Sequence, residues 1–533
     1  MLVPAVLGLG QIRSTSATYD EPVHLAAGYT DLVDGRFRLN ALDHPPLAEM
    51  WAALPLLALR PNVFPTHPAW LNAAVYHYGD LFLNQNRVSG RKLLGTARVW
   101  NLLTLTVLLA AALVLWARRL EGDEGALGAA IAFAFCVPWI ANASLVTTDA
   151  MSAALFFVAF SLMSVRPRPR RVWLAAGAVT GAALASKFNM VVLPALMTCC
   201  LLGEAKVERR AVDWKSFGGA VFSSIALLTL CYGVYHLALF YDGLQATFSR
   251  LSQGRPSYLM GRWSSQGWWY YFPVAVLVKT PLPLLLLGAG GAVLAARRKA
   301  AEAVWLLLPP IGYFLASLTT KTQIGYRHIL PVYPFLCLWA GLALARLWRT
   351  AGRVAAVVLA AWLAVTVARV HPHHLAYFNE AAGGPADGAK WLADSNLDWG
   401  QDLKGLSEAV AARGNPPVVL SYFGSDDPAA YGLSYAPVGM IGNVERAGAP
   451  DGVLRPGAPV LFAVSQTNAS AVYFERKDAF AWLESRAPVA RPGWSIALYD
   501  LTADADGRAR VAAMLEGAGR PGDAKVLRLH STP

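Results

Sequence analysis

Carboxylates that could accept a proton or bind a cation occur at three places in the chain. Asp20 and Glu21 form an acidic pair, Asp43 and His44 precede two prolines, and Asp149 follows two threonines at the start of an apolar run. A carboxylate can take a proton from an attacking hydroxyl, and it can also bind a divalent cation. These residue types are what group transfer to a hydroxyl requires.

Cationic side chains interrupt apolar segments further along the chain. Lys187 follows a serine inside a long apolar stretch, Lys279 lies about two turns inside another, and Arg327 and His328 open a third. Ionisable residues at membrane depth are costly and tend to be functional. Lys and Arg neutralise a leaving phosphate, and a phosphate on a long lipid would reach them within the bilayer. Each also has a plain structural reading, such as a lysine that snorkels to the interface.

Composition excludes several classes of protein. The chain is 55% hydrophobic and only 15% charged, with a mean hydropathy of +0.39, whereas soluble domains carry about 25% charged residues. A soluble enzyme and a disordered protein are therefore excluded. All five cysteines lie in apolar runs, which excludes a disulfide scaffold. Residues 371–533 carry a net charge of −4, so the basic excess lies between hydrophobic runs and indicates topology, not nucleic-acid binding.

Ten membrane spans are predicted from the apolar runs, each near the roughly 20 residues that a spanning helix needs. The longest run is too long for one span and is broken at Ser186 and Lys187, so it is divided into two short helices. The runs are 94–116, 125–143, 148–165, 172–203, 216–240, 272–296, 301–319, 328–348 and 352–370.

Basic residues support this count of spans. With ten spans, 16 Lys and Arg residues fall on one side of the membrane and six fall in the short connections opposite. The positive-inside rule then places the 16 in the cytoplasm. The same topology places all the candidate carboxylates and cations at the outer side. Most of the Lys and Arg residues from which the topology was assigned lie elsewhere, so the agreement is largely independent of that assignment.

Three polar pieces are expected on that outer side. Residues 11–90 form a long first loop with an interfacial helix at 47–59, and residues 241–271 form an aromatic-rich loop. Residues 371–533 alternate helical stretches (400–412, 478–486) with β-like runs (418–423, 460–464, 496–501), followed from about 503 by one helix and a loose end. The predicted parts are 1–93 (partial first span and loop), 94–370 (membrane helices) and 371–533 (a small α/β domain).

The beginning of the sequence is unusual for such a protein. Residues 1–10 are apolar but too few to span, and the basic segment of a signal peptide is missing. We expect a natural start upstream of residue 1, with a first span lacking from the sequence as the alternative.

Several of these segments resemble the motifs of one family. Tyr19-Asp20-Glu21-Pro22-Val23-His24, followed by Asp43-His44-Pro45-Pro46-Leu47, resembles the first extracytoplasmic loop of the GT-C glycosyltransferases. More narrowly, it is similar to glycosyltransferase family 39, the protein O-mannosyltransferases and lipid A aminoarabinose transferases. Later segments are similar to further family motifs: 148–150, 186–188, 279–281, 325–331, 377–380, 383–385 and 394–403. The resemblance covers about residues 15–430.

The resemblance implies a fold and an activity. The expected fold is GT-C-like, and the expected activity moves a sugar from a polyprenyl-phosphate donor to an acceptor hydroxyl, with inversion, outside the cytoplasm. It implies Asp20 as catalytic base, with Glu21, Asp43 and Asp149 as further acidic positions of the catalytic set. It implies substrate-binding roles for a second set: His44, Lys187, Lys279, Arg327 and His328. A divalent metal among Asp20, Asp43 and Asp149 is left open, and no cofactor is firmly indicated.

Other classes of protein stay open at this point. A transporter or flippase of lipid-linked sugars also places charges in membrane spans, but its sites concentrate at the midplane, often within internal repeats, and no repeat is evident here. A non-catalytic envelope assembly factor is a further alternative. The sequence does not identify the sugar or whether the acceptor is a protein, a lipid or a glycan. Composition suggests a bacterial inner membrane, with membrane lipids as partners and an active site facing the periplasm.

Overall fold

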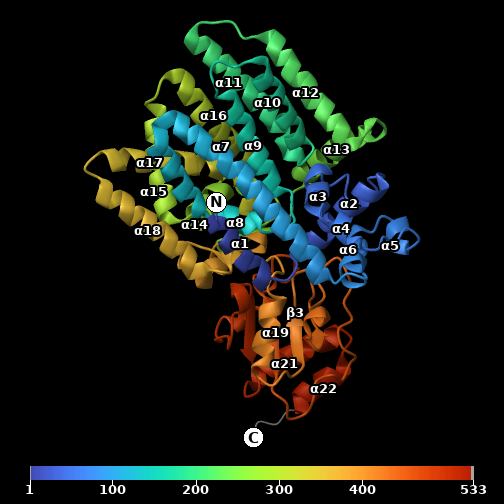
Figure 1. Cartoon of the computed structure of the whole chain (residues 1–533). Helices are drawn as coiled ribbons and strands as arrows, with labels where there is room; N and C mark the ends of the chain where they lie inside the picture. The colour runs from blue at the N-terminus through green and yellow to red at the C-terminus, as the bar shows by residue number, and fades with distance from the viewer. Residues whose placement is uncertain (1, 530–533) are drawn as a thin grey trace.

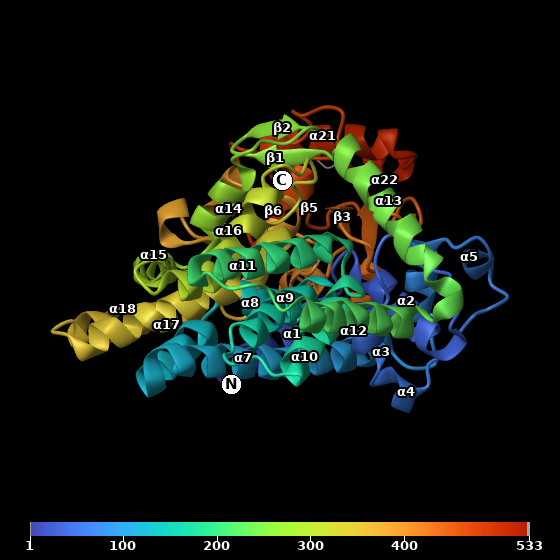
Figure 2. The same ribbon diagram turned by 90° about the horizontal axis from the view of Figure 1, so that it is seen from above.

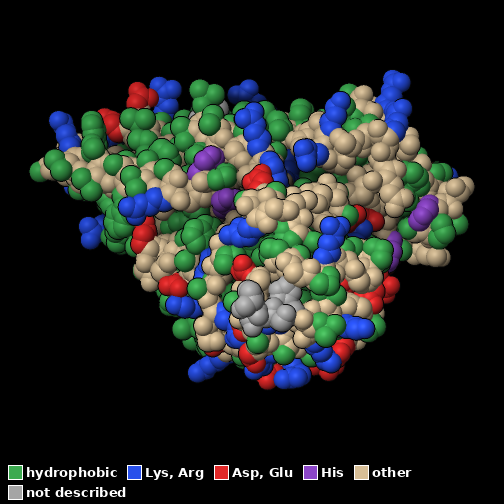
Figure 3. Space-filling model, turned by 90° about the horizontal axis from the view of Figure 1, so that it is seen from below, with side chains coloured by type: hydrophobic (Ala, Val, Ile, Leu, Met, Phe, Trp, Pro, Cys, Tyr) green, Lys and Arg blue, Asp and Glu red, His purple; other side chains and the backbone are tan. Residues whose placement is uncertain are grey.

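A computed structural model describes residues 2–529 as a broad helical part from which a smaller C-terminal part projects (Figure 1). This arrangement confirms the prediction of a polytopic helical membrane protein with a small C-terminal α/β unit. The division at residues 93 and 370 stays a prediction. Seen from the C-terminal side, charged side chains of both signs cover the projecting part, and hydrophobic side chains cover much of the wider part behind it (Figure 3).

Thirteen helices build the larger part, together with short 3-10 turns at their breaks. Most follow the apolar runs of the sequence. They are α1 (Leu2–Ser14), α7 (Gly90–Ala134), α8 (Val137–Ala143), α9 (Asp149–Met163), α10 (Arg170–Leu184), α11 (Val192–Glu208), α12 (Trp214–Tyr232), α13 (Ala238–Gln253), α14 (Tyr271–Lys279), α15 (Leu282–Ala296), α16 (Ala300–Ser317), α17 (Tyr333–Arg349) and α18 (Arg353–Val370).

The ten predicted spans correspond to fewer uninterrupted spanning helices. Within residues 2–529, six helices are long and apolar enough to cross a membrane, or seven if the bent pair α14 and α15 is one span. The difference has three sources. α7 contains parts of two predicted spans, and α9 and α10 have only 15 residues each. The predicted break in 172–203 is confirmed, because α10 ends at Leu184 and the next helical turn begins at Phe188.

Two breaks in the membrane helices follow from residue type. Gly122 inside α7 has φ 68 and ψ −154, a conformation that glycine adopts without steric cost, and it divides that helix. α14 and α15 meet at 115°, where Thr280 precedes Pro281. Proline lacks an N–H and disfavours a helical residue before it. The Asn379 Nδ2 donates to the Thr280 carbonyl at 3.0 Å, so this backbone group is satisfied inside the protein.

The first loop is more ordered than its polar composition indicated. It contains five helices: α2 (Glu21–Asp34), α3 (Leu47–Ala53), α4 (Leu56–Leu59), α5 (Pro68–Leu71) and α6 (Val75–Asn84). The single interfacial helix predicted at 47–59 is wrong in detail, because the chain breaks at Leu54 and Pro55 into α3 and α4. α2 packs on α3 and α6 around a small core that includes Leu25 and Phe82.

The C-terminal part is built on a four-stranded sheet in the order β4-β3-β5-β6. β3 pairs in parallel with β4 and β5, and β6 is antiparallel to β5. The strands are β3 (Val418–Ser421), β4 (Tyr435–Pro437), β5 (Leu461–Ser465) and β6 (Ile496–Asp500). Its helices are α19 (Leu403–Ala411), α20 (Gln466–Ala469), α21 (Ala505–Gly517) and α22 (Pro521–Leu529), and a separate hairpin joins β1 (Ser257–Leu259) to β2 (Arg262–Ser264).

The three predicted strands are confirmed, but β4 was not predicted. The expected helix at 478–486 is wrong, since that segment contains only the 3-10 turn Ala481–Leu483. The segment after 503 forms two helices, not one.

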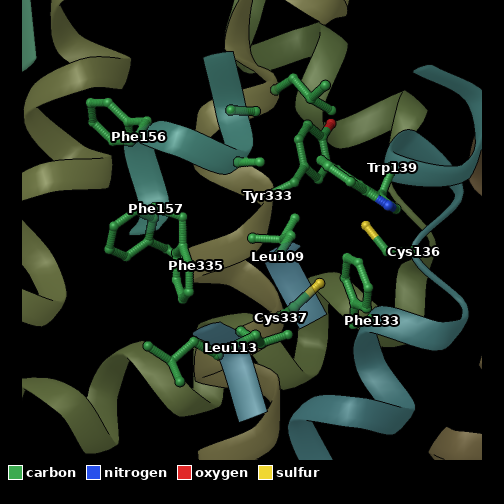
Figure 4. Packing of buried hydrophobic residues seen from close by; sticks show 14 of the residues in the cluster. Leu109, Leu113, Phe133, Cys136, Trp139, Phe156, Phe157, Tyr333, Phe335 and Cys337 are labelled. Atoms are coloured by element: carbon green, nitrogen blue, oxygen red, sulfur yellow. The ribbon is translucent and has the colours of Figure 1, made fainter. Parts of the chain in front are cut away.

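The main core lies where α7, α9 and α17 meet (Figure 4). Phe157 and Phe335 pack edge to face with ring centres 4.9 Å apart, and Trp116 contacts both rings. Such aromatic pairs contribute about 0.5–1.5 kcal/mol beyond the area they bury. This packing fixes α9 and α17 relative to each other. α9 begins at Asp149, and α17 follows the turn that contains Arg327.

Candidate functional site

Arg327 lies between two carboxylates that are far apart in the sequence. Its Nη2 is 3.4 Å from Asp20 Oδ2, and its Nη1 is 3.5 Å from Asp149 Oδ2. Arg327 is in the 3-10 turn Tyr326–Val332 before α17, Asp20 directly precedes α2, and Asp149 begins α9. A planar guanidinium can address two acceptors at once, so this residue joins the first loop to the membrane helices.

Lys187 completes this group from a fourth segment. Its ammonium forms an ion pair with Asp149 Oδ1, and both side chains are at least nine-tenths buried. Lys187 lies in the break after α10, in an extended conformation directly before the 3-10 turn Phe188–Val191 that leads into α11. Asp20, Asp149, Lys187 and Arg327 are called the central charge cluster below. The structure brings these four side chains together, and their role in a functional site stays a prediction.

A cavity of about 290 Å³ opens at this cluster. Asp20 is 24% exposed and lines it, whereas Asp149 is only 1% exposed behind it. Burial, with the neighbouring charge of Asp20, raises the pKa of Tyr19 to about 12, so its hydroxyl stays protonated. The lining comes from the first loop, the 255 region, the turn before α17 and the C-terminal part: Tyr19, Asp20, Tyr76, Arg255, Ile324, Arg327, Asp394, Trp399, Phe423, Met440, Ile441, Gly442, Asn443 and Tyr473.

The C-terminal part contacts the cluster directly. The Arg327 Nε donates to Ser395 Oγ at 3.2 Å, and its guanidinium stacks on the Trp399 ring. Asp394 is buried beside them and accepts a hydrogen bond from the Tyr473 hydroxyl. Burial raises the pKa of Asp394 above its ordinary value. The cavity wall therefore carries the buried carboxyl group of Asp394 and several aromatic side chains around the partly exposed carboxylate of Asp20.

Glu21 does not face this cavity, although it follows Asp20 in the sequence. Its carboxylate is fully buried, and the Arg98 Nε donates to it at 2.7 Å. It also accepts the backbone N–H groups of Thr18 and Val146, at 2.8 Å each. With its oxygens engaged in this way, Glu21 is placed to hold α2 against α7 and not to touch a substrate.

Asp43 and Lys279, also expected in the site, lie outside the cluster. Asp43 is 45% exposed and pairs with Arg250 of α13. The Lys279 Nζ donates to the Leu375 carbonyl at 2.9 Å and to the carbonyl of Asn396. Within residues 2–529, no ion pair joins either side chain to Asp20, Asp149 or Arg327. The geometry thus gives Lys279 a structural link to the segment after α18 instead of a contact with phosphate.

The two expected histidines lie near the cluster. The His44 ring centre is 4.9 Å from that of His24, and burial, with the charges of His24 and Lys187, holds the pKa of His44 well below its ordinary value. His44 is therefore neutral at pH 7. His328 directly follows Arg327, and its Nε2 is buried with no hydrogen-bond partner in the described part of the chain.

Several site residues were not predicted from the sequence. Arg98, Glu49 and His24 are buried ionisable residues in or beside apolar runs, and the His24 Nδ1 and Glu49 Oε1 are 2.7 Å apart. Of these three, Arg98 offered a usable signal, because it is an ionisable residue inside the predicted span 94–116. No sequence signal pointed to Phe423 and Tyr473, because only folding brings the C-terminal sheet to the cavity. Ring centres of this pair are 5.6 Å apart in a stacked arrangement.

The three carboxylates among which the sequence left a metal open do not lie together. Arg327 lies between Asp20 and Asp149, and Asp43 pairs elsewhere. Residues 2–529 contain no group of three or more His, Cys, Asp or Glu side chains arranged to hold a metal ion.

Comparison with known proteins supports the fold. The family model of the dolichyl-phosphate-mannose-protein mannosyltransferases matches residues 93–234. No curated protein matches the sequence. The chain is similar to the structure of ArnT from Cupriavidus metallidurans bound to undecaprenyl phosphate, with TM-score 0.53 and 15% identity over 94% of this chain and 96% of that one. It is also similar to apo ArnT from that organism, with TM-score 0.50 and 15% identity over 93% and 96%.

A further similarity is to the apo oligosaccharyltransferase of Archaeoglobus fulgidus, with TM-score 0.46 and 12% identity over 78% of this chain and 58% of that one. The ArnT comparisons cover nearly the whole of both chains. They confirm the GT-C fold that the sequence motifs predicted.

Proposed function

We propose that this chain, a membrane glycosyltransferase by fold and by family match, moves a sugar from a polyprenyl-phosphate donor to an acceptor hydroxyl at the central charge cluster. The observation that carries the proposal is the placement of Arg327 between Asp20 and Asp149, with Lys187 on the second carboxylate, beside a cavity. An exposed carboxylate next to two cations matches what transfer from a phosphate needs: a base and an anion site. The undecaprenyl phosphate bound to ArnT is a lipid of the donor class proposed here.

The reaction is a direct displacement at the anomeric carbon. The acceptor hydroxyl oxygen forms a bond to that carbon while Asp20 takes the hydroxyl proton. The bond from the same carbon to the phosphate oxygen breaks, and its electron pair leaves with the lipid phosphate. One displacement inverts the anomeric configuration. General-base catalysis of this kind contributes about 10²–10⁴-fold.

The two cations, Arg327 and Lys187, stabilise the leaving phosphate. Arg327 and Lys187 approach the same carboxylate, Asp149, which holds them in place before a phosphate arrives. Charge that develops on the leaving phosphate meets these preorganised cations in a partly buried site, where such interactions are stronger than in water. Asp149, which is 1% exposed, therefore acts as a positioning residue for both.

The charge pattern supports a location for the reaction. Basic residues of two predicted cytoplasmic loops meet in the structure, since Arg298 and Arg349 both pair with Glu121. By the positive-inside rule, the cluster at the opposite ends of the helices faces the periplasm of a bacterial inner membrane. The acceptor is a hydroxyl of a protein, a lipid or an envelope glycan.

Sugar transfer in nanodiscs tests this proposal. Wild type, Asp20→Asn and Asp34→Asn are incubated with radiolabelled polyprenyl-phosphate sugars and host membranes as acceptor. Asp34 is a matched control because it is an acidic residue of α2 that pairs with exposed Arg36, away from the cavity. Wild type and Asp34→Asn should transfer label, and Asp20→Asn should lose at least 100-fold, the lower bound for a missing base.

Two outcomes would contradict the proposal. Equal transfer by Asp20→Asn and wild type would remove the base from the mechanism. Movement of the labelled lipid between leaflets with no label on any acceptor would favour the alternative, a flippase of lipid-linked sugars.

A further inference from the structure

A second charged site lies at the far end of α9 from the central charge cluster. α9 begins at Asp149 and has 15 residues, about 22 Å of helix, and the segment after it carries Arg166 and Arg168. A polar cavity of about 200 Å³ opens there between the ends of α9 to α12. Its lining includes Arg166, Arg168, Glu204 and Arg210.

An apolar cavity of similar size, about 200 Å³, adjoins the polar one. Trp173 of α10 and Leu201 of α11 line both, so the two share a wall. The apolar cavity continues along the helices toward Val221 and Ile225 of α12, which are 42% and 56% exposed. A charged cavity at the membrane end thus leads into an apolar groove that opens on the lipid-facing surface.

Helix packing explains why the groove exists. α10 and α12 lie side by side (Figure 2), in such close contact that a Cβ at Gly177 would be 2.1 Å from the Ala220 carbonyl oxygen, and one at Gly181 2.3 Å from that of Ser224. α11 instead packs on α16. The space between α11 and the α10–α12 pair is left to form the groove.

Charge around the polar cavity is strongly positive. Residues 166–171 and 204–215 together carry eight Lys and Arg against Glu204, Glu208 and Asp213. Glu204 is 1% exposed and pairs with Arg166, Arg168 and Arg210, so it gathers three guanidinium groups at one point. Arg168 is buried, whereas Arg166 is 34% and Arg210 51% exposed.

We propose that this pair of cavities binds an anionic glycerophospholipid of the surrounding leaflet. Its phosphate lies against Arg166 and Arg210, and one acyl chain follows the groove past Val221 and Ile225. Basic pockets between membrane helices are suited to anionic lipid headgroups. The adjoining apolar groove selects a lipid over a soluble phosphate. This site is separate from sugar transfer, so its test does not depend on the proposed activity.

Native mass spectrometry of the full chain in detergent tests this site. The probes are dioleoyl phosphatidylglycerol, which is anionic, and dioleoyl phosphatidylcholine, which is not. Wild type should bind the first lipid about tenfold more tightly than the second. The Arg166→Gln/Arg210→Gln variant should lose that preference, and Arg170→Gln/Arg171→Gln, which removes the same charge outside the cavity lining, should keep it.

Arg168 is left in place because it pairs with Glu204 at 2.7 Å and stacks on Trp305 of α16. If the double variant unfolds, the lipid preference is measured on Arg210→Gln alone. In that variant Glu204 keeps Arg166 and Arg168 as partners, so the fold should be retained. Ile225→Trp should fill the groove and block binding. Leu230→Trp, on the same helix outside the lining and 77% exposed, should not.

Three results would overturn the proposal. They are equal binding of the two lipids by wild type, an unchanged preference in the Arg166 and Arg210 variants, and an equal loss in the Arg170 and Arg171 control. The last of these would mean that general surface charge, and not this cavity, attracts the lipid.

Discussion

The Arg327 guanidinium lies over the indole ring of Trp399, with its Cζ 3.9 Å from the ring centre. Trp399 belongs to the segment that leads into the C-terminal sheet, whereas Arg327 lies in the 3-10 turn before the membrane helix α17. The same stacking leaves Nη1 and Nη2 directed at Asp149 and Asp20. The C-terminal part therefore positions a cation of the central charge cluster, and is more than an appended domain.

Replacing Trp399 by leucine should slow sugar transfer while the protein stays folded. A cation–π contact in a desolvated site contributes about 2 kcal/mol, so kcat should fall about tenfold or more. Because Trp399 acts through Arg327, Trp399→Phe should restore most of the rate. Trp269→Leu, at a position 70% exposed, is the control and should match wild type. Loss of folding without any change in kcat per folded molecule would contradict this positioning role.

The two buried lysines should behave differently when each is replaced by methionine. Lys187 pairs with Asp149 in the central charge cluster, so Lys187→Met should raise KM for the polyprenyl-phosphate sugar and lower kcat by at least tenfold. Lys279 donates to carbonyls and lies 4.3 Å from the ring centre of Phe378, so Lys279→Met should lower Tm instead.

Donor KM, kcat and Tm measured on the same preparations separate these two roles. Lys187→Arg serves as the conservative control and should keep donor binding better than Lys187→Met. A raised donor KM in Lys279→Met with an unchanged Tm would restore this lysine to the phosphate site.

Much of the fold was predictable because its signals are local. Apolar runs and basic loops located the membrane helices, and the break at Lys187 followed from two polar residues in an apolar stretch. The bend at Thr280 and Pro281 had a proline signal, but its angle of 115° depends on neighbours such as Asn379. Helices of the first loop were missed because a polar composition hides the buried face of α2, which packs on α3 and α6.

The site was predictable in part. Asp20, Asp149, Lys187 and Arg327 come together because each lies at or beside a helix end, and these ends meet at one end of the helical part. Residues next to these four in the sequence do not all lie in the cluster. Glu21 is one residue from Asp20, and its side chain turns to Arg98, a partner 77 residues away. Such long-range pairing depends on how the helices pack, and motif spacing in the sequence carries no information about that packing.

Asp43→Asn should affect transfer much less than Asp20→Asn. Asp43 is 45% exposed and pairs with Arg250, and exposed ion pairs contribute only about 0–1 kcal/mol. We expect kcat within about fivefold of wild type and an unchanged Tm. A loss of transfer as large as that of Asp20→Asn, at unchanged Tm, would place Asp43 in the catalytic site after all.

The buried pair of Glu21 and Arg98 should make stability depend on pH. Burial alone would raise the pKa of Glu21, but the charge and hydrogen bonds of Arg98 hold it below its ordinary value of 4.5. A lowered carboxylate pKa contributes stability that is fully present above about pH 4.5 and is lost as the pH falls through the value in the folded state.

Glu21→Gln should therefore lower the free energy of unfolding at pH 7 by about 3–5 kcal/mol, the usual effect of breaking a buried pair. The difference from wild type should shrink below about pH 4.5, where the wild-type carboxylate becomes protonated first in the unfolded state and, at lower pH, in the folded state. Glu21→Gln/Arg98→Met should recover part of the loss, because no charge is then left unpaired. Denaturant unfolding in detergent between pH 3.5 and pH 7 measures this. A difference that does not change over this range would show that the charge on Glu21 does not stabilise the fold.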